Sequence, residues 1–409
     1  MKIFISAYAC EPYKGSEPGI GWNFVNELAN YHEVHVLTRS NNKESIDKYN
    51  SKNITFHYYD VPKWLSFWKK GKRGYQTYYY LWQLLAYKEY NTFVNNSNFD
   101  VVHHLTFGAN WMGSLFMNCK PKTIWGPVGS EDIYEPIVKT LPFKIKVKEL
   151  FRTFVKSFFY YIEPVRWITL SKSDLILNHS SKYAKYTYPN FVKNKVQDCT
   201  QTGLNITDKE YLPYQEIKSF NKDEKIKLLI CSELVAWKGV LISSKIFSIL
   251  ANELDNIELI VIGDGPQKND MKKIFEKYNV SQKVTFKGFV DKEEMLKSLY
   301  HSDILLYPAY HHGLATIILQ SMYCFLPIIS MAGDIISDTV HNNCGLSADG
   351  KTYKEIEKNL LINTKKLIQD NDLRIELSKN GRKILEEKYT WEKLTININK
   401  IYEGIVNDK

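Results

Sequence analysis

Cysteine is scarce in this chain of 409 residues, and its six cysteines are scattered without a Cys-x-x-Cys pair. Zinc sites and disulfide frameworks use closely spaced cysteines, so this spacing argues against both and favours a reducing compartment. No stretch of 18 or more residues is apolar, so no segment is expected to span a membrane. The apolar run at residues 3–7 is too short for a signal peptide and leads into Glu11, so it is expected to form a buried strand.

Neither sign of charge is in large excess, because 54 Lys and Arg residues stand against 45 Asp and Glu residues, a formal net charge of +9. For this length the balance is too small to indicate nucleic acid as a partner. Hydrophobic residues make up 44% and charged residues 24%, which excludes a largely disordered or fibrous chain. A chain this long exceeds one compact core, so two domains are expected.

Short β-branched and apolar runs alternate with helical patterns in the first half of the chain. Helical patterns cover residues 22–30 and 78–94. The expected strands are residues 2–7, 33–38, 54–58, 101–104, 123–125, 175–178 and 196–200. Continuous apolar strands separated by helices are typical of a parallel sheet that is covered on both faces.

The alternation stops at the polar residues 205–225 and then resumes, with helices such as 242–250 and 268–278. The strands expected there are residues 226–231, 257–262, 284–287, 304–307 and 327–330. The fold class is therefore predicted to be α/β, with doubly wound Rossmann-like domains at residues 1–205 and 226–389 and a linker at 206–225. Such folds bind ligands beyond the carboxyl ends of their strands, so we expect the site in a cleft between facing domains.

Gly15, Gly19 and Gly21 lie between the first expected strand and the next helix. Glycines let a backbone approach a ligand closely, and a helix N-terminus favours an anion. A tight turn with packing glycines explains the same residues equally well. The spacing differs from the Gly-x-Gly-x-x-Gly pattern of dinucleotide-binding loops.

Lys238 follows the first strand of the second half and precedes a turn glycine. A lysine at the carboxyl end of a strand can pair with a phosphate, but an ordinary surface lysine has the same local sequence. Gly263 and Gly265 end the strand at residues 257–262, and by themselves they indicate only a turn into the next helix.

Residues 307–322 end a strand and begin an amphipathic helix near Ala315, with Gly313 allowing a sharp turn between them. The backbone N–H groups that open such a helix could hold a diphosphate. His311 and His312 also suggest a metal. No Asp, Glu or Cys accompanies them at ligand spacing, so no metal site is expected.

In this order and spacing, the segments resemble a family-4 retaining glycosyltransferase of the GT-B fold, one of the group 1 glycosyltransferases of the bacterial surface-polysaccharide type. The resemblance covers nearly the whole chain. Besides the segments above, it rests on residues 9–12, 100–104, 125–129, 284–288 and 389–391. In this fold the last helix, here residues 390–409, usually crosses back onto the first domain.

The resemblance implies transfer of a sugar from a nucleotide-diphosphate sugar to a saccharide acceptor, with retention of anomeric configuration and without a metal or other cofactor. The first domain would take the acceptor and the second the nucleotide sugar. Without a metal, cationic side chains and a helix amino end must stabilise the departing diphosphate. The matching positions are Lys238, Gly313, Leu314, Ala315 and Thr316 for the diphosphate, Phe286 through Val290 for the base, His103 or His104 for the transferred sugar, Gly15 and Gly19 for the phosphate side or the acceptor, and Gly263 and Gly265 within the donor-binding half.

The chain departs from the family at three positions. The family usually has two glutamates eight positions apart, where this chain has His312 and Gln320, and an arginine where this chain has Glu233. Gln320 can still hydrogen-bond a ribose hydroxyl pair, and His312 can bond a sugar hydroxyl. Glu233 either pairs with His312 and keeps it protonated, or turns outward and leaves the site to Lys238 alone.

Two segments combine basic and aromatic residues. Residues 61–80 contain five basic and no acidic residues, and residues 137–170 contain seven basic and two acidic residues among Phe and Leu side chains. Such segments can lie on anionic lipid, which fits a polyprenyl-diphosphate-linked acceptor. Ordinary domain helices with solvated lysines are the alternative.

The sequence thus predicts a metal-independent retaining glycosyltransferase of bacterial lipopolysaccharide O-antigen or capsule biosynthesis. It would be cytoplasmic, either free or peripheral on the inner face of the cytoplasmic membrane. One rival is a catalytically inactive glycosyltransferase-like subunit that only binds, which the replacements at positions 233, 312 and 320 motivate. The other is a GT-B sugar-nucleotide epimerase, which would need no acceptor.

Overall fold

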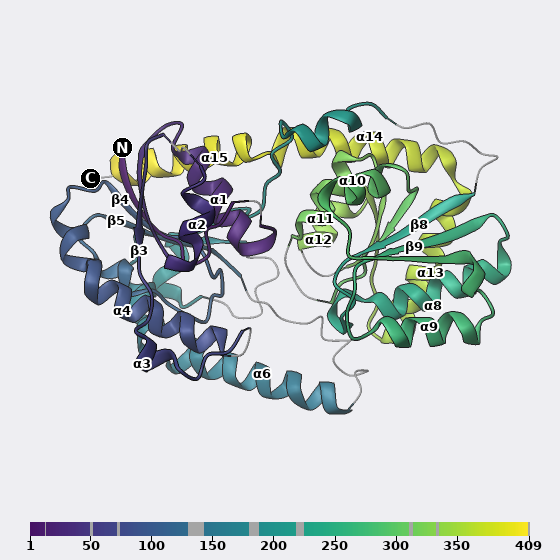
Figure 1. Ribbon diagram of the computed structural model, residues 1–409, viewed down its shortest axis with the longest axis horizontal. Coiled ribbons are helices and arrows are strands. Elements are labelled where there is room, and N and C mark those ends of the chain that lie inside the picture. Colours follow the sequence, from purple (N-terminus) through teal and green to yellow (C-terminus); the bar gives the residue numbers. More distant parts are fainter. Residues whose placement is uncertain are drawn as a thin grey trace. The chain divides into compact units, whose positions relative to one another are not determined.

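The chain divides into two compact units, each built on one parallel sheet (Figure 1). The computed structural model describes residues 1–12, 14–49, 52–71, 74–129, 143–179, 188–217, 225–310, 314–332 and 335–407. Unit 1 comprises Met1–Ser130, Leu150–Gly203 and Trp391–Lys409, and unit 2 comprises Glu131–Glu149 and Leu204–Thr390. The α/β fold class that the sequence predicts is confirmed.

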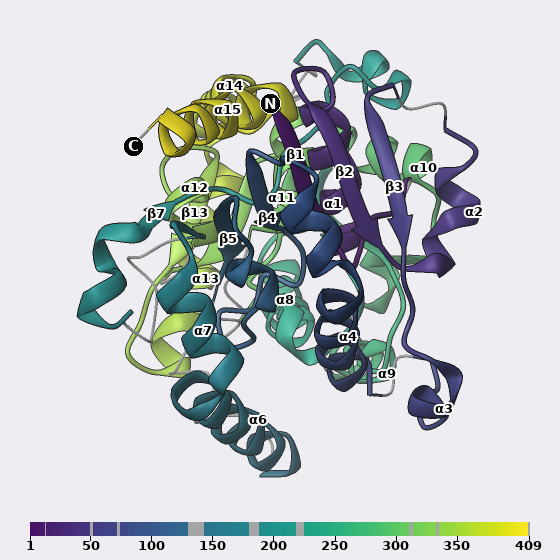
Figure 2. The same cartoon turned by 90° about the vertical axis from the view of Figure 1, so that its left-hand side faces the viewer.

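The sheet of unit 1 has the order β3-β2-β1-β4-β5-β6-β7, and its paired strands are parallel. Its strands are β1 (Lys2–Ser6), β2 (Glu33–Thr38), β3 (Ile54–Tyr58), β4 (Val101–His104), β5 (Lys122–Val128), β6 (Leu175–Asn178) and β7 (Val196–Asp198). Figure 2 shows β3, β2, β1, β4 and β5 side by side in this order. In β1, Phe4 packs on one face while Ile3 and Ile5 pack on the other, which explains the continuous apolar run.

The final helix belongs to unit 1. The helices of unit 1 are α1 (Ser16–Leu28), α2 (Lys43–Ile46), α3 (Lys63–Ser66), α4 (Tyr75–Asn96), α7 (Pro164–Lys172) and α15 (Trp391–Asn407), with short 3-10 helices η1 (Ser40–Asn42), η2 (Leu115–Asn118) and η4 (Asn190–Lys195). Helix α6 (Phe143–Ile162) belongs to unit 2 up to Glu149 and to unit 1 from Leu150. Trp391, Ile398 and Tyr402 of α15 are buried in the same cluster as Trp22 and Val25 of α1. One face of the sheet is therefore covered by residues from both ends of the chain.

The sheet of unit 2 has the order β10-β9-β8-β11-β12-β13 and is also parallel. Its strands are β8 (Ile226–Cys231), β9 (Ile257–Ile262), β10 (Val284–Gly288), β11 (Ile304–Leu306), β12 (Ile328–Met331) and β13 (Gly345–Ala348). The sequence did not predict β13, because Gly-Leu-Ser-Ala carries little apolar or β-branched signal. A Cβ on Gly345 would lie 1.9 Å from the Ile328 carbonyl oxygen, so this strand needs a glycine to pair closely.

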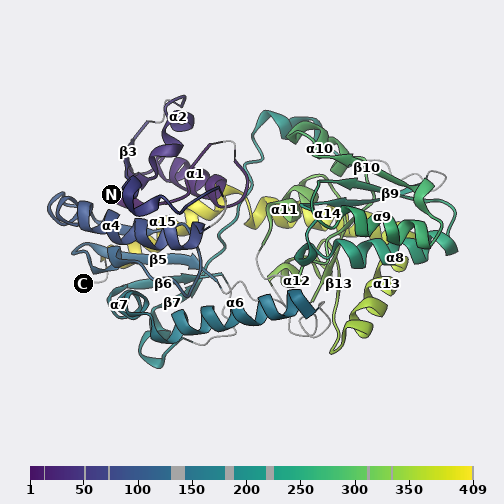
Figure 3. The same ribbon diagram turned by 60° about the horizontal axis from the view of Figure 1, so that its bottom comes forward.

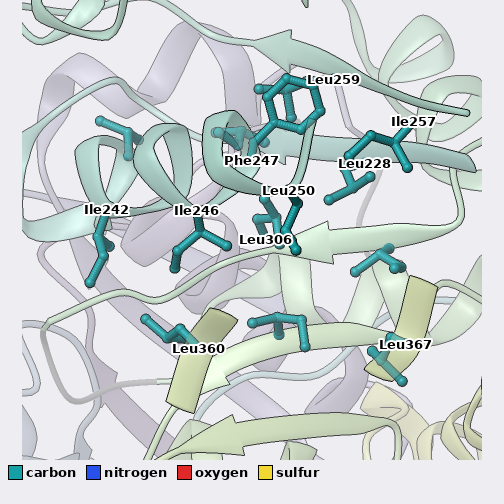
Figure 4. Close-up of a cluster of buried hydrophobic side chains, with 14 of the residues drawn as sticks. Leu228, Ile242, Ile246, Phe247, Leu250, Ile257, Leu259, Leu306, Leu360 and Leu367 are labelled. Carbon is teal, nitrogen blue, oxygen red and sulfur yellow. The ribbon is translucent and has the colours of Figure 1, made fainter. Parts of the chain in front are cut away.

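Helices cover both faces of this second sheet. They are α8 (Val240–Glu253), α9 (Lys268–Lys277), α10 (Lys292–Tyr300), α11 (Thr316–Tyr323), α12 (Ile335–Val340), α13 (Tyr353–Gln369) and α14 (Asn371–Lys388), with 3-10 helices η5 (Lys209–Tyr214), η6 (Ala236–Lys238) and η7 (Ser281–Lys283). Side chains of α8, α9 and α13 form one core and those of α10, α11 and α12 form the other. Figure 3 shows the ribbons of these helices around the sheet. Figure 4 shows the first core, where the Phe247 ring of α8 lies beside Leu259 of β9.

Two local features differ from the sequence expectations. Helix α1 begins at Ser16 rather than near Trp22, so Gly19 and Gly21 lie inside it. Part of the expected linker is the 3-10 helix η5, whose aromatic rings are buried in the second core of unit 2. Among the described residues, no helix is long and apolar enough to cross a membrane.

Candidate donor site

The strand order of unit 2 reverses between β8 and β11. The chain moves outward from β8 through β9 to β10, and then returns to β11 on the other side of β8. Ligands of open α/β sheets bind at such a reversal, beyond the carboxyl ends of the strands. The loop after β8 contains Glu233 and Lys238, and the loop after β11 leads from Tyr307 to α11. The loops that carry Glu233 and Lys238 and that lead to α11 therefore lie at the position where a ligand site is expected.

The loops after β8 and β11 are held together by backbone contacts. The Tyr310 N–H donates to the Trp237 carbonyl oxygen at 2.7 Å. Gly239 has φ +69°, and a Cβ there would lie 2.1 Å from the Pro308 carbonyl oxygen. Because only glycine combines this conformation with this close approach, Gly239 fixes the position of Lys238 beside the β11 loop.

Lys238 ends the 3-10 helix η6 and is half-buried. Its Nζ donates to the Tyr307 hydroxyl at 2.7 Å and lies 5.2 Å from the centroid of that ring. The ammonium group is thus held at the carboxyl end of β11. Tyr307 was not predicted from the sequence as the hydrogen-bond partner of Lys238. A signal existed, because Tyr307 directly follows β11, the strand that pairs with the one before Lys238.

Helix α11 begins at Thr316 beside the same loop. Its N-cap, Ala315, is extended at φ −81° and ψ 141° and has no side-chain capping bond. Leu314, one residue earlier, is buried in the second core of unit 2 and anchors the start of the helix. The first N–H groups of this helix are therefore available as backbone donors, together with the positive end of the helix dipole.

Gln320 lies one turn into α11 and is only 9% exposed. Its Nε2 donates to the hydroxyl of Tyr211 at 3.2 Å. Tyr211 comes from η5, inside the segment that the sequence assigns to the linker. No local pattern pointed to it, because its partner is 109 residues away in the chain.

Glu233 is exposed and makes no ion pair within the described part of the chain. Its proposed partner His312, like Gly313, lies outside the described residues. The Glu233–His312 pairing therefore stays a hypothesis.

The remaining donor-side candidates have clear packing roles. A Cβ on Gly263, at φ +120°, would lie 1.9 Å from the Ser232 carbonyl oxygen. A Cβ on Gly265, at φ +157°, would lie 2.6 Å from the Leu234 carbonyl oxygen. Both glycines thus allow the loops after β8 and β9 to touch, as expected of a structural turn. The side chains of Phe286 and Val290 are partly buried against the two cores of unit 2, whereas Phe289 between them is 77% exposed.

The two histidines expected to face the sugar are buried inside unit 1. His103 bonds the Tyr402 hydroxyl through Nδ1 at 2.6 Å and the Gly126 carbonyl oxygen through Nε2 at 2.7 Å. His104 bonds the Tyr79 hydroxyl through Nε2 at 2.7 Å and the Ser6 hydroxyl through Nδ1 at 3.1 Å. Because all four ring nitrogens are occupied within the domain, the expectation that either ring faces a sugar does not fit this geometry.

Burial also keeps both imidazoles neutral. It lowers the pKa of His103 to about 4. Burial, with a smaller contribution from His103, lowers the pKa of His104 to about 3. Since a carbonyl oxygen can only accept, His103 carries its proton on Nε2 and accepts from Tyr402 on Nδ1. These histidines join the sheet to α15 and α4.

The first-loop glycines differ from each other. Gly15 is exposed, and a Cβ added there would meet nothing within 4 Å. A Cβ on Gly19 would lie 2.0 Å from the Lys14 carbonyl oxygen, so packing explains this residue. Gly15 has no such packing reason to be glycine, and its role at a ligand stays a prediction.

Part of the chain matches a known family model. Residues 214–384 match the family model described as glycosyl transferases group 1. That segment contains Lys238, the α11 start and Gln320. An uncharacterized glycosyltransferase of Methanocaldococcus jannaschii is 27% identical over 269 residues, 64% of this chain and 66% of the relative. Protein CapJ of Staphylococcus aureus is 30% identical over 202 residues, 47% of this chain and 50% of CapJ. The matches therefore span about two thirds of the first relative and half of the second.

Solved structures match nearly the whole chain. Sucrose-phosphate synthase from Thermosynechococcus elongatus has a TM-score of 0.69 at 14% identity, covering 100% of both chains. WaaG, a glycosyltransferase involved in lipopolysaccharide biosynthesis, has a TM-score of 0.60 at 16% identity, covering 98% of this chain and 100% of WaaG. HepE from Anabaena, in complex with UDP, has a TM-score of 0.61 at 13% identity, covering 99% of this chain and 100% of HepE. The two parallel-sheet α/β domains match GT-B glycosyltransferase structures, and the comparisons together support a glycosyltransferase.

Proposed function

We propose that this chain transfers a sugar from a nucleotide-diphosphate sugar to a saccharide acceptor, with retention of anomeric configuration and without a metal. The observation that carries the proposal is the Lys238 ammonium held at the Tyr307 hydroxyl, in contact with the loop that leads into α11. The UDP bound in the HepE structure supports a nucleotide as the ligand of such a fold.

The chemical task is to stabilise the nucleoside diphosphate as it leaves the sugar. An ammonium group has three donor hydrogens, and Tyr307 accepts only one from Lys238. The other two, with the first N–H groups of α11, supply positive potential for the developing negative charge. One preorganised donor of this kind typically contributes about 100- to 1000-fold in rate. A site of this design carries the charge with a side chain and peptide dipoles in place of a divalent ion.

We further propose that the acceptor is linked to a lipid at an anionic membrane surface. Helix α6 turns its apolar side outward, since Phe151 and Phe154 are 67% and 68% exposed while Lys156 on the other side is 4% exposed. On α3, Trp64 and Phe67 are exposed as well. Aromatic side chains facing outward beside lysine-rich sequence fit the headgroup layer of anionic lipid.

This placement fits a polyprenyl-diphosphate-linked saccharide at the inner face of a bacterial cytoplasmic membrane. The likeness to WaaG, which is involved in lipopolysaccharide biosynthesis, supports a role in building O-antigen or capsule. This setting rests on likeness of fold and on surface chemistry.

The decisive experiment is a screen of nucleotide sugars, with turnover or hydrolysis followed by mass spectrometry and binding followed by thermal stabilisation. We expect UDP or GDP to stabilise the parent protein and to lose this effect in Lys238→Ala. A nucleotide that binds while no nucleotide sugar is consumed would instead indicate the binding-only subunit. Free nucleotide and an altered sugar without an acceptor would indicate the epimerase. If no nucleotide binds, the proposal is wrong.

A further inference from the structure

A second group of charged side chains lies in unit 1, where three neighbouring strands end. Tyr8 follows β1, Arg39 follows β2 and Asp60 follows β3, and these strands are adjacent in the sheet. Because the strands are parallel, their carboxyl ends share one edge of the sheet. Sheets of this kind bind ligands at that edge. The group belongs to unit 1 and is not among the donor-side residues described above.

The Arg39 guanidinium packs against two tyrosine rings. Its Cζ lies 5.0 Å from the centroid of the Tyr8 ring and 5.2 Å from that of the Tyr78 ring. Both tyrosines are buried, and the Arg39 side chain is 21% exposed. Its Nε pairs with Asp60 at 3.5 Å. A guanidinium carries five N–H donors in a planar fork that fits a phosphate group, so this one long contact leaves most of them for a ligand.

The carboxylate of Asp60 is engaged within unit 1 itself. Its Oδ1 also accepts from the Tyr78 hydroxyl at 3.2 Å, and its Oδ2 accepts from the Ser40 N–H at 3.2 Å. The Tyr78 hydroxyl in turn accepts from the Val61 N–H at 3.3 Å. Asp60 therefore fixes the Tyr78 ring and the head of Arg39 at the strand ends.

Lys69 brings a second cation to the same ring. Its Nζ lies 5.0 Å from the centroid of the Tyr78 ring, and the side chain is half-buried. Within the described part of the chain, Lys69 forms no ion pair. Two cations and one carboxylate leave a net positive charge at these strand ends. An anion with several oxygens, such as a diphosphate, can bond the guanidinium and the ammonium together.

The segment just before Lys69 indicates where such an anion comes from. Trp64 in α3 and Phe67 directly after it are 73% and 79% exposed, and the proposed function places these rings in the headgroup layer of a membrane. The phosphate groups of a lipid-linked acceptor stay at that level, because the hydrocarbon chain is anchored in the bilayer. Lys69 is only two residues beyond Phe67, so the cationic group adjoins the surface at which those phosphates would lie.

We propose that Arg39 and Lys69, held around the Tyr78 ring, bind the diphosphate of the lipid-linked acceptor. The inference rests on the proposed function, since it takes the acceptor to be linked to a lipid through a diphosphate. The guanidinium contributes a planar pair of N–H donors and the ammonium a point charge, which together distinguish a diphosphate ester from an uncharged lipid. The ordinary anionic headgroups of the membrane share the charge but are not held by this pair.

The test measures co-sedimentation of the full chain, without nucleotide, with neutral phosphatidylcholine vesicles that carry either undecaprenyl diphosphate or uncharged undecaprenol. The parent should prefer the diphosphate vesicles. Lys69→Gln removes one charged donor and should weaken binding to them by about tenfold or more. Lys70→Gln is the matched control, because it removes the same charge one residue later from an exposed side chain. It should weaken binding by less than about fivefold, the effect of one lysine near an anionic surface.

Vesicles of phosphatidylcholine and phosphatidylserine at the same total charge separate the acceptor diphosphate from an ordinary headgroup. On these vesicles Lys69→Gln and Lys70→Gln should lose binding equally. Arg39→Gln, with its folding checked by the urea midpoint of unit 1, should behave like Lys69→Gln on the diphosphate vesicles.

Three results would overturn the inference. The first is an equal loss in Lys69→Gln and Lys70→Gln on the diphosphate vesicles, and the second is a folded Arg39→Gln that binds them like the parent. The third is a parent that binds the undecaprenol vesicles as tightly as the diphosphate vesicles. None of these measurements uses a nucleotide, whereas the proposed function is itself overturned by a parent that binds neither UDP nor GDP.

Discussion

Acid should destabilise unit 1 because its two buried histidines are held neutral. The pKa values of His103 and His104 are lowered by burial to about 4 and about 3, against about 6.5 in an unfolded chain. The unfolded state therefore binds more protons than the folded state below pH 6.5, and stability falls as the pH falls. The stability that these two neutral histidines provide is fully present above pH 6.5 and is lost progressively as the pH falls to about 4.

The size of the effect follows from these values. At pH 5 each histidine should lower the free energy of unfolding by about 2 kcal/mol relative to pH 8, which is about 4 kcal/mol for the pair. Domain stabilities are about 5 to 15 kcal/mol, so the loss should be large. Burial lowers the pKa of His57 as well, which acts in the same direction.

Tryptophan fluorescence during urea unfolding reports mainly on unit 1. Of the nine tryptophans in the sequence, only Trp237 lies within unit 2. We expect the urea midpoint of the fluorescence transition to fall steeply between pH 7.5 and pH 5. The control is the double variant His103→Gln, His104→Gln, which cannot be protonated at these positions. It should be less stable at pH 7.5 but should show a shallower pH dependence, and the part that remains is due to His57 and to His179, whose pKa burial lowers to about 4. A parent midpoint that is the same at both pH values would refute the reasoning.

Three further outcomes test the site and the surface. Lys238→Ala removes the ammonium charge and should lower turnover by about 100-fold or more. Tyr307→Phe removes only the hydroxyl that accepts from Lys238 and should lower turnover by less than about tenfold. Equal losses in the two variants would contradict this reasoning. Gly239→Ala should lower the stability of unit 2 in urea unfolding by more than Gly288→Ala. Both glycines have positive φ, but only a Cβ at position 239 would also meet a carbonyl oxygen, at 2.1 Å. Similar losses would show that contact to be unimportant. Replacing both Phe151 and Phe154 by Ser should weaken co-sedimentation with anionic vesicles and leave nucleotide binding intact, and unchanged sedimentation would argue against the membrane face.

The strands were predictable because both faces of each sheet are buried. A strand such as β1 or β8 is then apolar at consecutive positions, as at residues 3–5 and 228–230, and such runs are visible without any knowledge of their neighbours. Strand β13 escaped because its burial depends on small residues. Helix α1 was placed too late because its first turns contain Gly19 and Gly21, which normally mark a loop. Here the helix needs both glycines, because a side chain at either position would collide with a backbone carbonyl oxygen.

The site was predictable where neighbouring strands present their ends, and not where partners are distant in sequence. Lys238 could be placed because it follows β8 and the β11 loop follows the next strand in the sheet. The position of His103 at a strand end suggested the same exposure. Its true partner, Tyr402, is 299 residues away on the last helix, and no local pattern reveals that bond. A residue at the end of a buried strand can therefore close a core as readily as it can face a ligand.

Two of the places where the chain passes from one unit to the other, after Gly203 and after Thr390, are joined to each other. On the unit 2 side, the Leu204 N–H donates to the Tyr389 carbonyl oxygen at 2.8 Å, and Leu204 forms a β-bridge with Thr390. On the unit 1 side, a Cβ on Gly203 would lie 2.9 Å from the Trp391 ring, so only a glycine allows the approach. The segment that leads on to Tyr211 therefore starts at an isolated β-bridge and a backbone hydrogen bond, both of which join residues that are far apart in the chain.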